Sequence, residues 1–153
     1  MADSIKLTPV QNRNDYLPYL LLADETEDII KEYINEGEMY SIEYNDKTIG
    51  VCLFTFSSPL SVELKNFAID SSYQGRGLGK LVVKKAFKLY KDKGVHDMVV
   101  GTANSSIANM AFYQKAGFRI DAIYKDFFTS YPEPIYEDGI QALDMIRFRK
   151  RLT

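Results

Sequence analysis

Hydrophobic residues along the chain switch several times between the spacing of a strand and the spacing of a helix. Short apolar runs between polar turns predict strands, and in chain order these runs cover residues 5–10, 39–44, 48–56, 61–69, 97–103, 118–124 and 140–149. Apolar residues three and four positions apart predict helices, which cover residues 16–22, 26–36, 80–93 and 105–116, with Pro18 interrupting the first. This order predicts an α/β (α+β) fold in which helices cover a mixed sheet.

The strand predicted over residues 61–69 differs from the others because both of its faces are apolar. Its apolar residues are Val62, Leu64, Phe67 and Ile69. A strand with two apolar faces is typical of the centre of a sheet that is covered on both sides. We therefore expect residues 61–69 to be central.

The size and composition of the chain indicate one domain over residues 1–153, because 153 residues with 46% hydrophobic residues are sufficient for one core. The 19 Lys and Arg residues nearly balance the 21 Asp and Glu residues, which argues against a nucleic-acid partner. Cys52, the single cysteine, has apolar neighbours and predicts a buried, inert thiol in a reducing compartment. The start lacks a basic segment followed by an apolar run, and no run reaches about 18 apolar residues, so we expect a cytoplasmic protein without a membrane partner.

Three glycines at alternate positions, Gly75, Gly77 and Gly79, connect the central strand to the helix that follows. Glycines at a strand-to-helix turn let backbone N–H groups approach an anion, and the helix N-terminus adds a positive dipole end. Arg76 and Lys80 add positive charge. The spacing fits neither the dinucleotide-binding nor the P-loop pattern. The turn predicts a pyrophosphate site, and the alternative is a tight corner without a ligand.

Residues 74–79, Gln-Gly-Arg-Gly-Leu-Gly, resemble the [RQ]-x-x-G-x-[GA] signature of the GNAT superfamily of acetyl-coenzyme A (acetyl-CoA) dependent N-acetyltransferases. Residues 66–70 are similar to the fourth strand of that family, and residues 109–118 to its late helix ending in Tyr-x-x-x-Gly-Phe. The resemblance, to small bacterial members of unassigned substrate, implies a mostly antiparallel sheet of about seven strands. It also implies that strands 4 and 5 splay apart and that about four helices flank the sheet.

The resemblance further implies how acetyl-CoA, the co-substrate, is bound. The pantetheine arm would pair with main-chain groups of the fourth strand, at Phe67, Ala68 and Ile69. The pyrophosphate would lie against the turn, whose residues are Gln74, Gly75, Arg76, Gly77, Leu78, Gly79 and Lys80. The family often has an asparagine at the position of Ser106, so the contact with pantetheine is left open between Asn104, Ser106 and Asn109. Asn104 is alternatively the N-cap of the late helix.

Two residues are candidates for proton transfer. The resemblance implies that the Tyr113 hydroxyl protonates the departing thiolate, a role that suits a phenol because it is protonated near pH 7; the alternative is a tyrosine that packs on the sheet. An alkyl amine is neutral in on the order of one part in a thousand at pH 7, so a base must remove its proton before attack. Glu63 lies where histone-type members have their base and shares strand parity with Phe67 and Ile69. The alternatives are a solvent-exposed glutamate, a pair with Lys65, or a chain of water molecules.

The segment 126–139 combines aromatic and acidic residues with two prolines between the last two strands. Long irregular loops are often functional, and acids and aromatic rings attract a cationic amine. The candidate acceptor-binding residues are Tyr131, Glu133, Tyr136 and Glu137. The alternative is a surface segment that closes the sheet edge or contacts a second copy.

His96, the single histidine, is expected at the surface, and no metal is expected.

These observations favour an enzyme that moves an acetyl group directly from acetyl-CoA to a primary amine of a small cationic molecule, such as a polyamine or aminoglycoside. Proteins or peptides are the alternative acceptors, and a non-catalytic CoA sensor is the alternative function. Strand edges make a homodimer plausible.

Overall fold

The computed structural model describes residues 5–153, so the first four residues of the predicted domain lie outside the described part. Most elements of this region have the type that the sequence predicts. In chain order they are β1 (Ile5–Pro9), the 3-10 helix η2 (Arg13–Tyr16), α1 (Leu17–Ala23), α2 (Glu27–Lys31), β2 (Glu38–Tyr44), β3 (Lys47–Ser58), β4 (Ser61–Ile69), the 3-10 helix η3 (Ser71–Tyr73), α3 (Leu78–Asp92), β5 (Asp97–Ala103), α4 (Ile107–Ala116), β6 (Arg119–Tyr124), β7 (Tyr136–Glu137), β8 (Ile140–Gln141) and β9 (Met145–Arg151).

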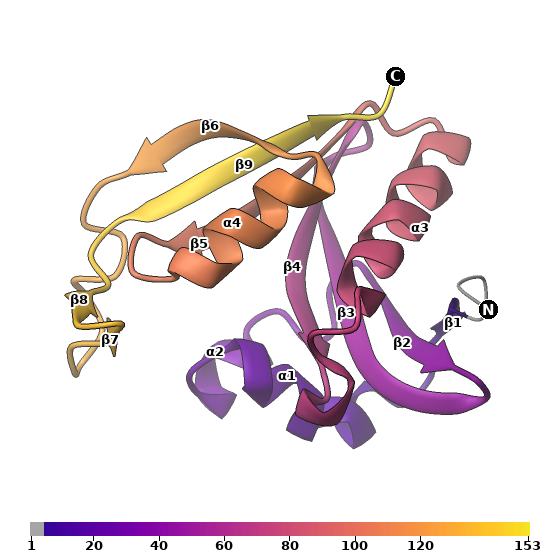
Figure 1. The fold of residues 1–153 in the computed structure, drawn as a ribbon, viewed down its shortest axis with the longest axis horizontal. Coiled ribbons are helices and arrows are strands. Elements are labelled where there is room, and N and C mark those ends of the chain that lie inside the picture. Colours follow the sequence, from indigo (N-terminus) through magenta and orange to yellow (C-terminus); the bar gives the residue numbers. More distant parts are fainter. Residues whose placement is uncertain (1–4) are drawn as a thin grey trace.

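The main sheet has seven strands in the order β1-β2-β3-β4-β5-β9-β6 (Figure 1). All neighbouring pairs are antiparallel except β4 and β5, which are parallel. The predicted mixed, mostly antiparallel sheet is confirmed. The strand predicted to be central, β4, lies in the middle of the order.

The parallel pair β4 and β5 is joined over only three residue pairs, from Ser61 with Asp97 to Glu63 with Val99. Beyond Glu63 the two strands separate, and in Figure 1 β5, β9 and β6 swing away from β4 toward the left. The splay that the resemblance implied is therefore present. It leaves the second half of β4 paired only on its β3 side.

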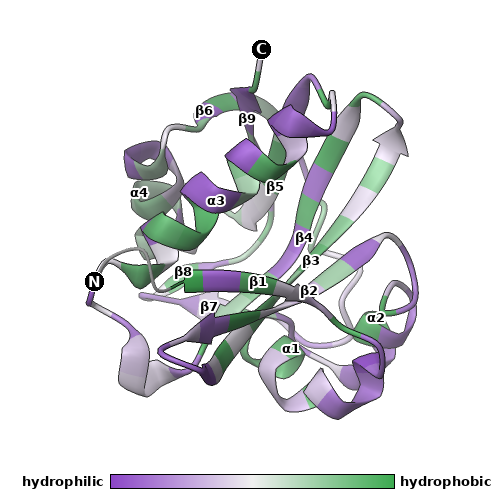
Figure 2. Cartoon of the chain, turned by 90° about the vertical axis from the view of Figure 1, so that its right-hand side faces the viewer, coloured by the Kyte–Doolittle hydropathy of each residue, from purple (hydrophilic) through white to green (hydrophobic). Residues whose placement is uncertain are grey.

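Two hydrophobic cores hold the helices against opposite faces of the sheet. The larger core lies beneath α3 and α4 and includes Phe54, Tyr90 and Phe148, all fully buried. The smaller core joins α1 and α2 to β2 and β3 through residues such as Leu20 and Ile30. Figure 2 shows hydrophobic and hydrophilic stretches alternating along α3, as a helix with one buried face requires. The helices thus sandwich the sheet and leave the gap between β4 and β5 open.

The strand predicted over residues 140–149 is wrong as one element. Residues 140–141 form β8, which pairs with β7 in a separate two-stranded hairpin, and β9 begins only at Met145. The main-chain N–H groups of Leu143 and Asp144 donate to the Asn104 side-chain oxygen at 2.8 and 3.0 Å. Because a side chain takes these two donors and the Ala142 N–H donates to the Ile135 carbonyl, residues 142–144 do not continue β9.

The two N-terminal helices also differ from expectation. Pro18 lies in the first turn of α1, where its missing N–H is tolerated, so it does not interrupt that helix. Thr26 caps α2 by accepting from the Ile29 N–H at 3.2 Å, but α2 ends at Lys31 instead of continuing toward Gly37. The Arg13 guanidinium donates to the carbonyls of residues 34, 36 and 37, and so stabilises an irregular turn there.

We predict that Gly50→Ala destabilises the junction of β3 and β4. A Cβ at Gly50 would lie 2.1 Å from the Ala68 carbonyl oxygen, which is a main-chain atom in a central strand. Overpacking of this kind costs about 1–3 kcal/mol or more. Urea unfolding measures the loss, and Thr48→Ala, an exposed position on the same strand, is the control with an expected change within about 0.5 kcal/mol. Equal midpoints for the two variants would contradict the prediction.

Candidate functional site

The splay opens a cleft of about 1480 Å³ through the middle of the molecule. β4, β5, the glycine turn and α4 line one part of it, and the α1–α2 segment and residues 127–137 line the other. Pockets for one small ligand usually measure about 300–1,000 Å³. This cleft has room for a large ligand and a second molecule beside it.

The glycine turn has the geometry of an anion site. Gly75 and Gly77 have φ values of +75° and +76°, which glycine adopts without strain, and Gly77 is the N-cap of α3. The first N–H groups of a helix have no intrahelical partner, and they face an anion favourably. The Gln74 side chain donates to the Ile69 carbonyl at 2.9 Å and so ties the turn to the end of β4. The turn is therefore fixed at the edge of the cleft.

The two basic residues of this turn lie differently. Lys80 lines the cleft together with Gln74, Gly75, Gly77, Leu78 and Gly79. Arg76 is not among these lining residues, and its guanidinium lies over the rings of Tyr44 and Tyr73, at 5.6 and 5.4 Å from their centroids. Positive charge at this end of the cleft therefore comes from Lys80.

A β-bulge interrupts β4 at Lys65. Asn66 pairs with Leu53 and Leu64 pairs with Phe54, so one extra residue lies in β4. A bulge reverses the alternation of side chains beyond it. Val62 and Leu64 lie in the core beneath α3, and Glu63 between them faces the side of α1 and α2.

The predicted shared face of Glu63 and Phe67 is wrong for this reason. Beyond the bulge, the ring of Phe67 lies 6.1 Å from that of Phe112 on α4, on the opposite side of the sheet from Glu63. Both residues still line the cleft. Glu63 is thus placed on the face opposite to the helices that follow the glycine turn.

Asn66, next to the bulge, takes part in a buried hydrogen-bond network that the sequence did not predict. Its side chain is 4% exposed and donates to the Leu20 carbonyl at 3.0 Å and to the Tyr33 hydroxyl at 2.9 Å. The Tyr33 hydroxyl donates to Asp24 at 2.7 Å, and burial raises the pKa of Tyr33. The partners are far apart in sequence, so local spacing gave no signal. The network joins β4 to α1 and α2.

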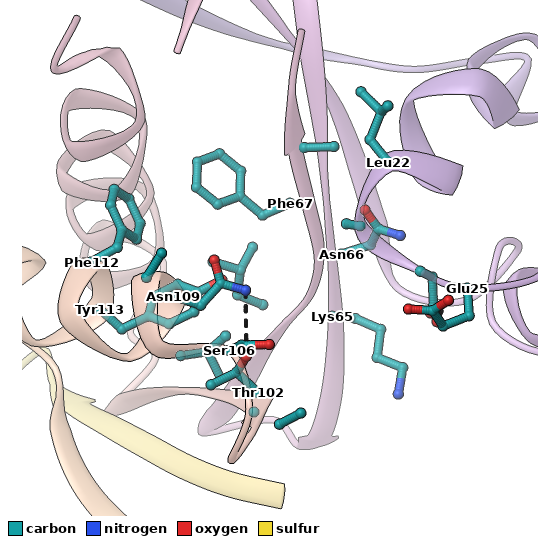
Figure 3. Close-up of a pocket in the computed structure, with 18 of the residues that line it drawn as sticks. Leu22, Glu25, Lys65, Asn66, Phe67, Thr102, Ser106, Asn109, Phe112 and Tyr113 are labelled. Atoms are coloured by element: carbon teal, nitrogen blue, oxygen red, sulfur yellow. Dashed lines mark hydrogen bonds between the residues drawn. The ribbon is translucent and has the colours of Figure 1, made fainter. Parts of the chain in front are cut away.

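Tyr113, the predicted proton donor, lies on α4 at the cleft and is 8% exposed. The rings of Phe112, Phe118 and Phe148 surround it at 5.3, 5.7 and 6.0 Å. Burial raises the pKa of Tyr113 to about 12, so its hydroxyl stays protonated at neutral pH. In Figure 3, Tyr113, Asn109 and Phe112 lie on one side of β4, and Asn66, Leu22 and Glu25 lie on the other.

The three candidates for the pantetheine contact, which lie near the start of α4, have different contacts. Ser106 and Asn109 line the cleft, and the Asn109 amide donates to the Thr102 hydroxyl at 3.4 Å (Figure 3). Asn104 is not the N-cap of the helix, since Ser106 occupies that position. Instead the Asn104 amide binds main-chain groups of residues 141, 143 and 144. Asn104 holds the late segment in place.

Glu137 is also bound at the start of α4. Its carboxylate accepts from the hydroxyls of Ser105 and Ser106 at 3.1 and 2.6 Å. Of the four residues predicted to bind the acceptor, Glu137 and Tyr131 line the cleft, whereas Glu133 and Tyr136 are exposed and do not. The late segment therefore contributes less to the cleft than its composition suggested.

A group of carboxylates on the α1–α2 segment, which no motif in the sequence indicates, also lines the cleft. Burial raises the pKa of Tyr131, and three nearby carboxylates raise it further; these belong to Asp24, Glu25 and Glu32. The three residues and Glu36 line the cleft. The late segment thus faces the α1–α2 segment across the cleft, and this end of the cleft is acidic.

Cys52 and His96, the single residues of their types, lie outside the cleft lining. Cys52 is fully buried, as predicted, and burial raises its pKa. His96 is exposed, as predicted. Within residues 5–153, no group of His, Cys, Asp and Glu side chains is arranged to hold a metal ion. None of the helices in the described part is both long and apolar enough to cross a membrane.

Comparison with known proteins identifies the fold. The sequence profile of the Acetyltransferase (GNAT) family matches residues 8–118. The chain belongs to the GNAT acetyltransferase family. An uncharacterized N-acetyltransferase of Bacillus subtilis, YvbK, is 43% identical over 139 residues, which cover 90% of each chain.

Solved GNAT structures have the same architecture. A GNAT acetyltransferase from Elizabethkingia anophelis with acetyl-CoA bound is 36% identical, with a TM-score of 0.87 over 97% of this chain and 99% of that one. A Bacillus cereus structure named IAA acetyltransferase is also 36% identical, with a TM-score of 0.88 over 97% and 99% of the two chains. This chain is therefore a GNAT acetyltransferase that acts with acetyl-CoA.

We predict that Glu137→Ala loosens the late segment. Loss of two hydrogen bonds to a carboxylate removes on the order of 2 kcal/mol of local stability, which raises the population of the opened segment at least tenfold. Limited trypsin digestion should then cut after the exposed Lys125 severalfold faster than in the unchanged protein. Glu133→Ala, on the exposed part of the same segment, is the control. Equal cleavage rates for both variants would show that Glu137 does not anchor the segment.

Proposed function

We propose that this GNAT enzyme, with residues 1–153 as one domain, transfers the acetyl group to a primary amine of a small cationic molecule, such as a polyamine or an aminoglycoside. The observation that carries the proposal is the charge distribution along the cleft. One part has the glycine turn and Lys80, and the part formed by β4 and the α1–α2 segment has five carboxylates against the one cation of Lys65; the carboxylates are Asp24, Glu25, Glu32, Glu36 and Glu63. An anionic coenzyme and a cationic acceptor fit such a cleft in one orientation.

In this proposal the coenzyme enters along the unpaired half of β4. Main-chain groups of residues 67–69 that face the gap need hydrogen-bond partners, and the pantetheine arm supplies them. The pyrophosphate lies against the N–H groups at the start of α3, with Lys80 beside it. Ser106 and Asn109 are the candidates on α4 for the contact with pantetheine, because both line the cleft.

The chemical step then follows from the two sides of β4. Glu63 removes a proton from the ammonium group, and the free nitrogen attacks the thioester carbonyl carbon, whose oxyanion faces main-chain N–H groups near Phe67. The N–C bond forms and the C–S bond breaks. The thiolate takes a proton from Tyr113, and the second proton of the attacking nitrogen leaves as the amide forms, so one proton in all is released to solvent.

The relatives do not settle the acceptor. The Bacillus cereus structure is named for IAA, whereas the carboxylates of this chain favour a cation. The acceptor class therefore rests on the cleft of this chain alone. Peptide amines are the alternative acceptors because the cleft is open at its acidic end, where several of its residues are exposed.

We predict that Tyr113→Phe and Glu63→Gln each lower kcat by about 10²–10⁴, the usual contribution of a positioned proton donor or base. Release of free thiol from acetyl-CoA at pH 8 measures turnover with polyamines, aminoglycosides, amino acids, short peptides and IAA. Calorimetry should show unchanged coenzyme binding in both variants. Tyr124→Phe, on β6 and outside the cleft lining, is the control.

Each result of this assay has a distinct meaning. Full activity of Glu63→Gln would exclude Glu63 as the base and favour a chain of water molecules. Full activity of Tyr113→Phe would exclude the proton donor. Tight coenzyme binding without turnover of any acceptor would favour a non-catalytic CoA sensor over an enzyme.

We also propose that the chain forms a homodimer through β6. This strand is at the edge of the sheet, and its Ile120 and Ile123 side chains are 57% and 58% exposed. An exposed apolar edge strand favours pairing with another strand. We predict a mass of two chains by light scattering, and a single chain for Ile120→Lys combined with Ile123→Lys. A single-chain mass for the unchanged protein at micromolar concentrations would contradict the proposal.

A further inference from the structure

The turn that follows α1 combines carboxylates with aromatic rings in a way that the transfer step does not use. Asp24 and Glu25 lie on this turn and Glu32 is the C-cap of α2, and Tyr33 and Tyr131 line the cleft beside them. None of these residues lies on β4, where Glu63 is placed to meet the reacting nitrogen. The carboxylates of the α1–α2 segment and the Glu63 carboxylate therefore have separate roles.

A single amine, even together with the Lys65 ammonium group that lines the same cleft, cannot balance the charge of these three carboxylates. The reacting nitrogen loses its proton before attack and becomes part of a neutral amide afterwards. The carboxylates on the α1–α2 segment would then face an uncharged product. A second positive charge on the acceptor, one that does not react, would stay opposite them through the whole cycle.

Asn66 adds an observation that points to a ligand. Its Nδ2 donates to both the Leu20 carbonyl and the Tyr33 hydroxyl, so exchanging the amide O and N would bring two oxygens together at Leu20. The Oδ1 atom is therefore correctly placed, and it is buried without a hydrogen-bond partner. Figure 3 shows this amide directed from β4 toward Leu22 and Glu25. A buried carbonyl without a donor is unfavourable, and an N–H group of a ligand would satisfy it.

The chain itself demonstrates that a primary ammonium group fits here. The Lys65 Nζ lies 5.2 Å from the centre of the Tyr33 ring, within the range of a cation–π contact. Lys65 is exposed and can move aside. At the same time, the Asn66 and Asp24 bonds hold the Tyr33 hydroxyl on both sides and fix its ring.

We propose that the α1–α2 turn binds a second, non-reacting ammonium group of the acceptor, through the Asp24 carboxylate, the Asn66 carbonyl and the ring of Tyr33, with Tyr131 closing the opposite side. The acceptor is then a diamine or polyamine in extended form. This inference rests on the proposed function, because it assigns a site to the far end of the same acceptor.

The test compares linear diamines of three to six carbons with monoamines of the same length. For the unchanged enzyme, kcat/KM for at least one diamine should exceed that of its monoamine by about tenfold or more. Asp24→Asn keeps an acceptor for the Tyr33 hydroxyl but removes the charge. It should raise KM for the diamine about tenfold and KM for the monoamine by a much smaller factor, with kcat nearly unchanged for both. Asp28→Asn, an exposed carboxylate on α2 outside the cleft lining, should leave both acceptors unaffected.

Calorimetric titration of diamines into the complex with CoA measures the same site without chemistry. Binding that is weakened about tenfold by Asp24→Asn and unchanged by Asp28→Asn supports the site, even in an assay in which no acetyl group is transferred and the proposed function fails. Equal kcat/KM for diamines and monoamines, or equal diamine binding in Asp24→Asn and the unchanged enzyme, overturns the site and leaves acetyl transfer to monoamines intact.

Discussion

The separation of β4 from β5 after three residue pairs is the constraint on which the rest of the structure depends. A parallel pair would normally continue along both strands, and each broken pair leaves main-chain groups to be satisfied elsewhere. Here the bulge at Lys65 lies two residues after the last pair and increases the local twist of β4. Phe67 and Phe112 pack together near the glycine turn, where a side chain at Gly79 would meet Phe112 at 3.2 Å. The gap is therefore built into the packing.

The bulge also divides the work between the two faces of β4. Without the bulge, Glu63 and Phe67 would lie on the same face of the sheet, and the side chains on both sides of Lys65 would contact the same ligand. With it, Phe67 faces the helix that holds Tyr113, while Glu63 and Asn66 face α1 and α2. A coenzyme and an acceptor can then approach the same strand from opposite sides. One extra residue in a strand thus creates a two-sided site.

Much of this was predictable from the sequence, and the failures have physical reasons. The periods of apolar residues gave most of the elements, and the glycine turn with residues 109–118 gave the family. The bulge is visible in the sequence, because the apolar positions of β4 change from even numbers at Val62 and Leu64 to odd numbers at Phe67 and Ile69. This change was interpreted as a strand with two apolar faces. The break between β8 and β9 at residues 142–144 has no signal in the sequence, since it depends on hydrogen bonds to Asn104, almost forty residues earlier. Local patterns report local structure, and side-chain bonds between distant segments override them.

The same reason explains why the carboxylates of the α1–α2 segment were not predicted as part of the cleft. The late segment was chosen because its acids and prolines stand together in sequence, yet Glu137 is bound by two serine hydroxyls at the start of α4, and Glu133 lies outside the cleft lining. Besides Glu63 and Glu137, the carboxylates that line the cleft come from the α1–α2 segment, about a hundred residues before the late segment. Glu137 and Asn104 therefore act as supports for α4 and the late segment, and most of the carboxylates that a cationic acceptor would meet lie on the opposite wall.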